Sequence, residues 1–183
     1  MSREFFFQPN QFEILPVDHY REQWSKIPLL EIRDAIALEN QYLQFHVFML
    51  YRLRHRQTGS EYSAPVGLSL RAGAIKTTGL LCASIAEAAL LAHAEHRQYK
   101  LPKNPRYRTF GRVLQSWQNE DSSPKSDIAP IWVCLQSLFS HRNTIHLHKG
   151  VSEEQGFYDF LQDEHAFVGQ ARAAIKYLKT IES

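Results

Sequence analysis

Apolar positions along the chain recur at the three- and four-residue spacing of helices. No stretch shows the strict alternation of apolar and polar residues that marks a half-buried strand, and no internal repeat is visible. The pattern predicts an all-α fold, an up-and-down bundle of four to five main helices with short extra helices. The predicted main helices span residues 29–55, 72–96, 109–118, 127–148 and 162–181.

The segments between these helices are rich in Gly, Pro and polar residues, which is typical of loops. We interpret residues 1–183 as a single domain, in which 1–28 form an N-terminal arm with a short helix from Asp18 to Ser25 and 29–181 form the helical bundle. The arm contains Phe5, Phe6 and Phe7, which are too apolar for a free tail. We therefore expect the arm to pack onto the body of the protein or onto a partner.

Composition narrows the class of protein without defining a function. The chain has 183 residues, of which 44% are apolar and 22% charged, as in an ordinary globular domain. A net charge of +2 does not indicate a general nucleic-acid coat, although a local basic patch remains compatible with it. No uninterrupted apolar run approaches the roughly 20 residues that span a bilayer, and the first residues lack the pattern of a signal peptide. We expect a cytoplasmic protein with no membrane partner, whose Cys82 and Cys134 are buried free thiols.

The helix predicted over 127–148 carries an apolar stripe that ends in a charged residue. Arg142 lies on this stripe, and a charged side chain there is costly unless it is paired or faces a cleft. His146 follows four residues later on the same face, whereas His148 points away from Arg142 unless the helix ends there, and Gly150 marks such an end. The stripe consists of Ile131, Leu135, Leu138, Arg142 and Ile145.

A partner for this arginine is visible earlier in the chain. Glu87 lies within the apolar segment 85–91 of the predicted central helix. An acid in such a segment favours a cation across the helix interface, because burial of an unpaired charge is costly. We predict that Glu87 lies near Arg142 or near one of the histidines that follow it.

The residues from Arg142 onward resemble a known motif. Arg142 and Asn143 followed by a histidine near a helix end are similar to the R-x(4–6)-H motif of HEPN domains, and the interval from Arg142 to His148 has five residues. Arg-Asn-x-Ile-His-Leu at 142–147 also resembles a variant found in uncharacterised bacterial members. The resemblance covers roughly residues 29–181 as a helix pattern, and only the motif itself is specific.

The resemblance implies a bundle of four or five helices that forms a homodimer, with the motifs of two protomers facing each other across a cleft. Catalytic members cleave RNA without a metal or other cofactor, through attack by the RNA's own 2′-hydroxyl group. Many act in toxin–antitoxin or antiviral defence systems, which implies an antitoxin or another defence component as a partner. Other members have no nuclease activity.

Residue roles follow as a hypothesis from this chemistry. Arg142 would bind the scissile phosphate, and His148 or His146 would act as general base or acid, because histidine exchanges protons near neutral pH. His148 has the family spacing, whereas His146 has the better helical geometry. Asn143 would orient the phosphate or the histidine. His141 and Lys149 would add contacts to the phosphate, with Glu87 beside them in the substrate site.

The main alternative is a noncatalytic module that binds a nucleotide or a protein partner, with Arg142 and Glu87 as a structural ion pair. A metal site is not favoured, because His146 and His148 diverge on a helix and no acid or cysteine lies nearby. His93 and His96 are explained as surface histidines at a helix end. Trp117 and Trp132 are expected in the core, and no Gly-rich phosphate loop is present.

Two basic segments add a weaker indication of RNA binding. Residues 52–56 and 100–112 could form a rim that faces RNA, and Tyr99, Tyr107 and Phe110 could stack on bases. Charged runs at helix ends are more often simply solvated.

Overall fold

The protein is an assembly of helices around one long central helix. The computed structural model describes residues 14–54, 64–65, 68–120, 127–143 and 164–182. These ranges contain six α-helices and two short 3₁₀ turns, Pro105–Tyr107 and Ala129–Ile131. The helices are α1 (Val17–Gln23), α2 (Leu30–Arg52), α3 (Leu68–His96), α4 (Phe110–Glu120), α5 (Trp132–Asn143) and α8 (Glu164–Leu178). The prediction of an all-α fold is confirmed.

The predicted helices differ from the observed ones mainly at their ends. The helix expected from residue 127 begins at Trp132, after the 3₁₀ turn that contains Pro130. Proline suits a first turn, because it has no N–H group to place in the helical hydrogen-bond ladder. The predicted continuation of this helix to residue 148 lies outside the described residues, as do Phe5–Phe7. The only described strands, Leu53–Arg54 and Ala64–Pro65, pair in parallel over two residues each.

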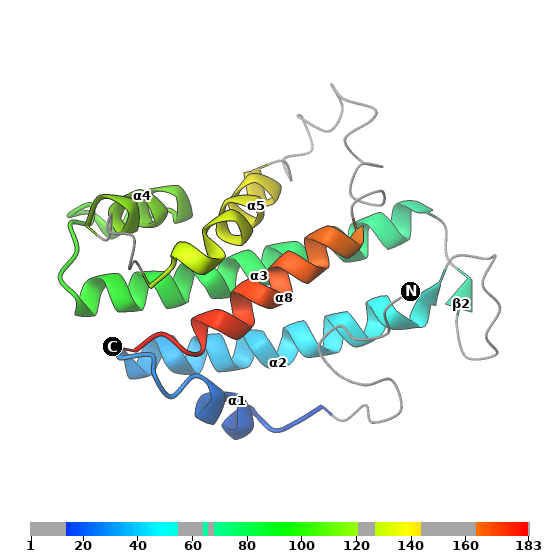
Figure 1. The fold of residues 1–183 in the computed structure, drawn as a ribbon. Helices are drawn as coiled ribbons and strands as arrows, with labels where there is room; N and C mark the ends of the chain where they lie inside the picture. Colours follow the sequence, from blue (N-terminus) through cyan, green and yellow to red (C-terminus); the bar gives the residue numbers. More distant parts are fainter. Residues whose placement is uncertain (1–13, 55–63, 66–67, 121–126, 144–163, 183) are drawn as a thin grey trace.

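Helix α3 occupies the centre of the fold and contacts α2, α4, α5 and α8. Figure 1 shows α2 running beside α3, with α8 crossing both and α4 and α5 on the other side of α3. Small side chains allow this close approach. A Cβ atom at Gly79 would lie 2.5 Å from the ring of Phe167 on α8, so glycine is required for that contact. Small residues of α3 with no exposed surface are Cys82, Ala83, Ala86, Ala89, Ala92 and Ala94, and Ala72 is 1% exposed.

The central position of α3 accounts for its apolar composition. Its residues Leu70–His96 form the one described helix that is long and apolar enough to cross a membrane. Of this apolar segment, 56% is buried inside the protein. A core helix that is covered on several sides passes the same test of length and composition. This finding alone is weak support for a membrane-spanning role.

The cysteines and tryptophans agree in part with the expectations. Cys82 is buried, and this burial raises the pKa of its thiol to about 12, whereas Cys134 is half-buried; both are free thiols within helices. Trp117 is fully buried in the core. Trp132 is half-buried and packs against that core rather than lying inside it.

Candidate functional site

The last turn of α5 positions Arg142. Leu135 and Leu138 lie on the same face of the helix and are 0% and 1% exposed, so they fix this face against the core. The predicted stripe is therefore observed as far as Arg142. The Arg142 side chain is 38% exposed, which places its guanidinium at the border between core and solvent.

Glu87 of α3 forms an ion pair with Arg142, as the sequence predicted. The Glu87 Oε2 atom accepts a hydrogen bond from Nη1 of Arg142, and the Glu87 side chain is 19% exposed. The pair connects residues 55 positions apart in the chain. A guanidinium has five N–H donors in a planar fork, so a carboxylate at one edge orients the group while other donors can bind a second anion.

An open pocket of about 630 Å³ lies beside this ion pair. Arg142 and Asn143 line it from α5, and the start of α4 contributes further lining residues. Its apolar lining comes from Leu80, Phe110 and Phe139. The remaining polar residues of the lining are Thr109, Arg112 and Gln115.

Gly111 allows the apolar part of this pocket to form. A Cβ atom at this position would lie 3.0 Å from the ring of Phe139, tighter than ordinary side-chain contacts. Phe139 meets Phe110 edge to face, with ring centroids 6.0 Å apart. The glycine thus lets α5 approach the first turn of α4, and this approach places Arg112 and Arg142 on one pocket.

Arg112 belongs to the site in a way that the sequence did not reveal. Its exposed side chain donates a hydrogen bond from Nη1 to Oε1 of Gln115 at 3.0 Å. In the sequence, Arg112 is only the last residue of the basic segment 100–112. No local pattern connects it with Arg142, since the two lie on different helices 30 positions apart and meet only through the packing of α4 against α5.

His141 packs against α8 and does not line this pocket. Its ring stacks on Phe167 of α8 with centroids 4.1 Å apart, and its Nδ1 lies 2.7 Å from the carbonyl oxygen of Ser137. It is not among the residues that line the pocket, and neither is Glu87, which holds Arg142. His146, His148 and Lys149 lie outside the described residues. The structure therefore brings Arg142, Asn143 and Glu87 together and separates His141 from the pocket.

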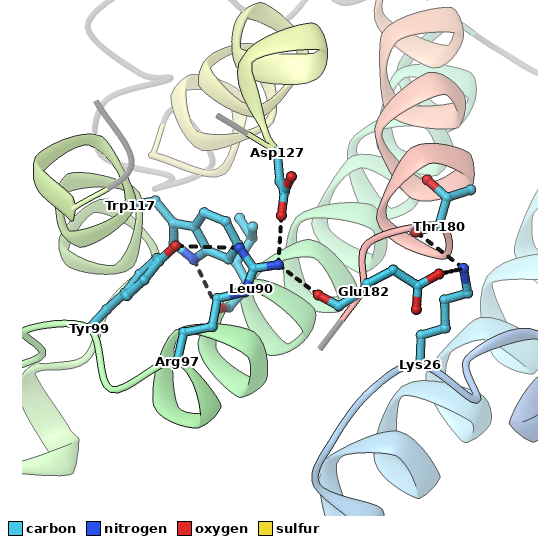
Figure 2. A network of polar contacts seen from close by, with 8 residues as sticks. All are labelled: Lys26, Leu90, Arg97, Tyr99, Trp117, Asp127, Thr180 and Glu182. Carbon is cyan, nitrogen blue, oxygen red and sulfur yellow. Dashed lines mark hydrogen bonds and ion pairs between the residues drawn. The ribbon is translucent and has the colours of Figure 1, made fainter. Parts of the chain in front are cut away.

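A second arginine, Arg97, forms a denser cluster at the end of α3 (Figure 2). Its Nη2 donates hydrogen bonds of 2.6 Å to a carboxylate oxygen of Asp127 and to the backbone carbonyl of Glu182. Its Nη1 lies 3.3 Å from the hydroxyl oxygen of Tyr99, and its guanidinium lies 5.1 Å from the ring centroid of Trp117. We call these five residues the Arg97 cluster.

Further bonds tie this cluster to the rest of the fold. The indole N–H of Trp117 donates to the carbonyl of Leu90 at 3.0 Å. The side chain of Glu182 pairs with Lys26, which also donates to the carbonyl of Thr180 at 3.3 Å. The cluster thus holds the end of α3, α4, the segment before α5 and the chain after α8 in one place.

His93 is buried, so the prediction that it is a surface histidine is wrong. It is 0% exposed, on α3 one turn before Arg97, and neither ring nitrogen has a hydrogen-bond partner among the described residues. Burial lowers its pKa to about 4, with help from the positive charges of Arg97 and His96. Other elements cover α3 at this point, so the helix end is not solvated on the side of His93. His96 is exposed, as expected.

The described residues contain no group of three or more His, Cys, Asp or Glu side chains arranged to hold a metal ion. Comparison with models of known protein families, with curated proteins and with solved structures found no match for this chain. What the fold and the site define is a helical protein with an arginine-lined pocket. Its assignment to a family remains a prediction based on the motif at Arg142.

Proposed function

We propose that this protein is a HEPN-like, metal-independent ribonuclease that acts as a cytoplasmic homodimer, in a toxin–antitoxin or antiviral defence system with a cognate partner. One observation carries the proposal. Arg142 stands at the end of a core-facing stripe, is held by Glu87 and still lines an open pocket together with Asn143 and Arg112. An arginine that served only the core would not need a pocket with a second arginine on its wall.

The proposed reaction needs no group beyond the protein and the RNA. A general base removes the proton of the 2′-hydroxyl, whose oxygen attacks the adjacent phosphorus. The bond from phosphorus to the 5′ oxygen breaks, and a general acid gives that oxygen a proton. The products are a 2′,3′-cyclic phosphate and a 5′-hydroxyl end. Arg142 stabilises the charge that develops on the phosphoryl oxygens, and His148 or His146 transfers the protons.

Glu87 serves this reaction by holding the guanidinium in position. A carboxylate on one edge of Arg142 fixes the plane of the group before the RNA binds, which reduces the cost of ordering it in the transition state. Asn143, at the pocket edge, would donate or accept a hydrogen bond to orient the phosphate.

The test is cleavage of a mixed RNA pool in the presence of EDTA. Wild type should leave cyclic-phosphate ends, and Arg142→Ala should lower the rate by about 100-fold or more. His148→Ala and His146→Ala show which histidine is required. Lys176→Ala is the control, because Lys176 is an exposed cation on α8 that lies outside the pocket lining and outside both basic segments. Cleavage that requires a metal ion, or that Arg142→Ala retains in full, would contradict the proposal.

The ion pair between Arg142 and Glu87 favours a second candidate, a noncatalytic helical module that binds a nucleotide or a protein partner. In that case the pair stabilises the contact of α3 with α5, and the pocket receives a ligand that is not cleaved. Folded wild type that cleaves no RNA in the pool, yet binds a nucleotide in a way that Arg142→Ala weakens, would support this module instead.

A further inference from the structure

Helix α2 carries a second apolar face that no described element covers. Leu38, Tyr42, Phe45 and Met49 follow each other at spacings of four, three and four residues, so they form one line along the helix. Their exposed fractions are 55%, 50%, 41% and 40%. The rings of Tyr42 and Phe45 stack with centroids 6.4 Å apart. We call these four residues the α2 stripe.

The α2 stripe lies opposite the face that α2 buries in the core. The buried positions Ile36, Leu43 and Val47 are each 1% exposed and lie about half a turn around the helix from the stripe. A helix at the surface of a bundle normally has polar residues on its outer face. A continuous line of four large apolar residues there indicates a surface that receives another segment.

The N-terminal part of the chain runs directly toward this stripe. The Asp34 carboxylate of α2 accepts a hydrogen bond of 2.9 Å from Nε of Arg21, and the side chain of Gln41 donates one of 2.8 Å to the carbonyl of Leu15. Followed backward from residue 21 to residue 15, the chain therefore advances along α2 from position 34 to position 41. Figure 1 shows α1 and residues 14–16 lying along α2.

The next positions along α2 are those of the stripe, since Gln41 precedes Tyr42 directly. Phe7 is eight residues before Leu15, and eight residues span up to about 26 Å. The stripe from Leu38 to Met49 is about 17 Å long. Residues 5–7 can thus reach any part of it.

We propose that the arm formed by residues 1–13 docks on the α2 stripe of the same chain, with Phe5, Phe6 and Phe7 covering the stripe. Three phenylalanines in sequence and four exposed apolar residues on the helix have matching chemistry, and burial of each ring removes a large apolar area from water. The hydrogen bond from Gln41 to Leu15 holds the chain that follows the arm at the edge of the stripe, which lowers the entropy cost of docking. This inference does not depend on the proposed nuclease activity.

The experiment replaces Phe6 with the photoreactive residue benzoylphenylalanine in the full chain. Protein labelled with heavy isotopes is mixed with unlabelled protein before irradiation, and the crosslinked peptides are identified by mass spectrometry. We expect residue 6 to be joined to residues 38–49 of the same chain. Crosslinks between heavy and light chains would show that the stripe receives a second copy, and crosslinks to other helices would place the arm elsewhere; either result overturns the proposal.

Substitutions on α2 provide a second test of the proposal. Leu38→Ser combined with Phe45→Ser should lower the yield of the intrachain crosslink several-fold, because the apolar surface is lost while the core face of α2 is unchanged. Val133→Ser is the matched control, since Val133 is 69% exposed on α5 and lies outside the stripe. An unchanged yield in the Leu38 and Phe45 variant would contradict docking on the stripe.

Discussion

Arg97 and Arg142 each lie at a helix end and pair with a carboxylate from another element, yet their surroundings differ. Arg97 is 21% exposed and contacts Asp127, Glu182, Tyr99 and the ring of Trp117. Arg142 is 38% exposed, pairs with Glu87 and lines an open pocket. The pairing alone thus does not separate a structural arginine from a candidate functional one. The number of contacts and the space beside the guanidinium separate them.

The two sites also differ in what they connect. The Arg97 cluster ties two segments outside the helices, Asp127 before α5 and the backbone of Glu182 after α8, to the end of α3. Arg142 and Glu87 join α5 to α3, two helices that already pack through buried residues such as Leu135 and Leu138. Loss of Arg97 should therefore cost stability, and loss of Arg142 should cost mainly function.

The largest effect on stability is expected for Arg97→Ala. The change removes the hydrogen bonds that Arg97 donates to Asp127 and to the Glu182 carbonyl, together with the contact with the Trp117 ring. We expect the free energy of unfolding to fall by about 3 kcal/mol and the melting temperature by roughly 9 °C. Thermal and urea unfolding measure this loss. Arg106→Ala, at an exposed arginine, is the control and should change stability by less than about 0.5 kcal/mol.

An Arg97→Ala protein as stable as wild type would contradict a structural role for Arg97, because the cluster would then contribute nothing to the stability of the fold. Arg97→Lys distinguishes the contribution of the positive charge from that of the guanidinium geometry. Lysine keeps the positive charge but lacks the planar fork and stacks less well on an indole ring, so it should recover only part of the lost stability.

The sequence predicted these two sites unequally well. Glu87 and Arg142 were paired in advance because each is a charged residue on an otherwise apolar segment, and such residues have few possible partners in a helical bundle. No such sequence pattern marks the residues of the Arg97 cluster. Its members at positions 97, 99, 117, 127 and 182 are ordinary surface residue types or a core tryptophan, and only the tertiary arrangement brings them together.

The incorrect interpretation of His93 has the same physical origin. Periodicity predicts that α3 is helical, but it does not tell how many other elements cover the helix near its end. Similarly, Arg112 could not be assigned to the pocket, because its position depends on the close contact that Gly111 allows between α4 and α5. Helix positions and apolar faces follow from local patterns, whereas sites built between helices require the packing itself.

A smaller effect is expected from the titration of His93, which lies beside the Arg97 cluster. Because its folded-state pKa is lowered to about 4, the unfolded chain takes up a proton first as the pH falls. The contribution to stability is present above about pH 6.5 and is lost as the pH falls toward 4. Between pH 7 and pH 5 the free energy of unfolding should fall by about 2 kcal/mol from this residue.

Urea unfolding at both pH values, for wild type, His93→Leu and His96→Leu, tests this expectation. His93→Leu should lose the part of the pH dependence that His93 causes. His96→Leu should keep most of it, because burial, and not the charge of the exposed His96, is the main cause of the lowered pKa of His93. Asp127 and Glu182 oppose the effect, since their negative charges raise the pKa of His93. An identical pH dependence in wild type and His93→Leu would show that His93 is protonated alike in the folded and unfolded states.

The smallest effect on stability is expected at the Arg142 site. A double-mutant cycle of Arg142→Ala and Glu87→Ala should give a coupling energy of about 1 kcal/mol or less, because the pair is partly solvated. Arg142→Ala should therefore remain folded under conditions in which Arg97→Ala has begun to unfold. Its circular dichroism and melting temperature, measured beside RNA cleavage, separate a lost reaction from a lost fold.

A coupling energy near 3 kcal/mol would make Arg142 resemble Arg97 and would favour the noncatalytic module. A small coupling energy, together with a loss of RNA cleavage in Arg142→Ala, would favour the ribonuclease. The guanidinium would then contribute little to the ground-state fold and much to a charge that exists only when RNA reacts, as expected of an arginine at a pocket wall. Glu87→Ala tests whether Glu87 only positions Arg142. If it does, loss of the Glu87 carboxylate should lower the rate of cleavage less than loss of Arg142 itself.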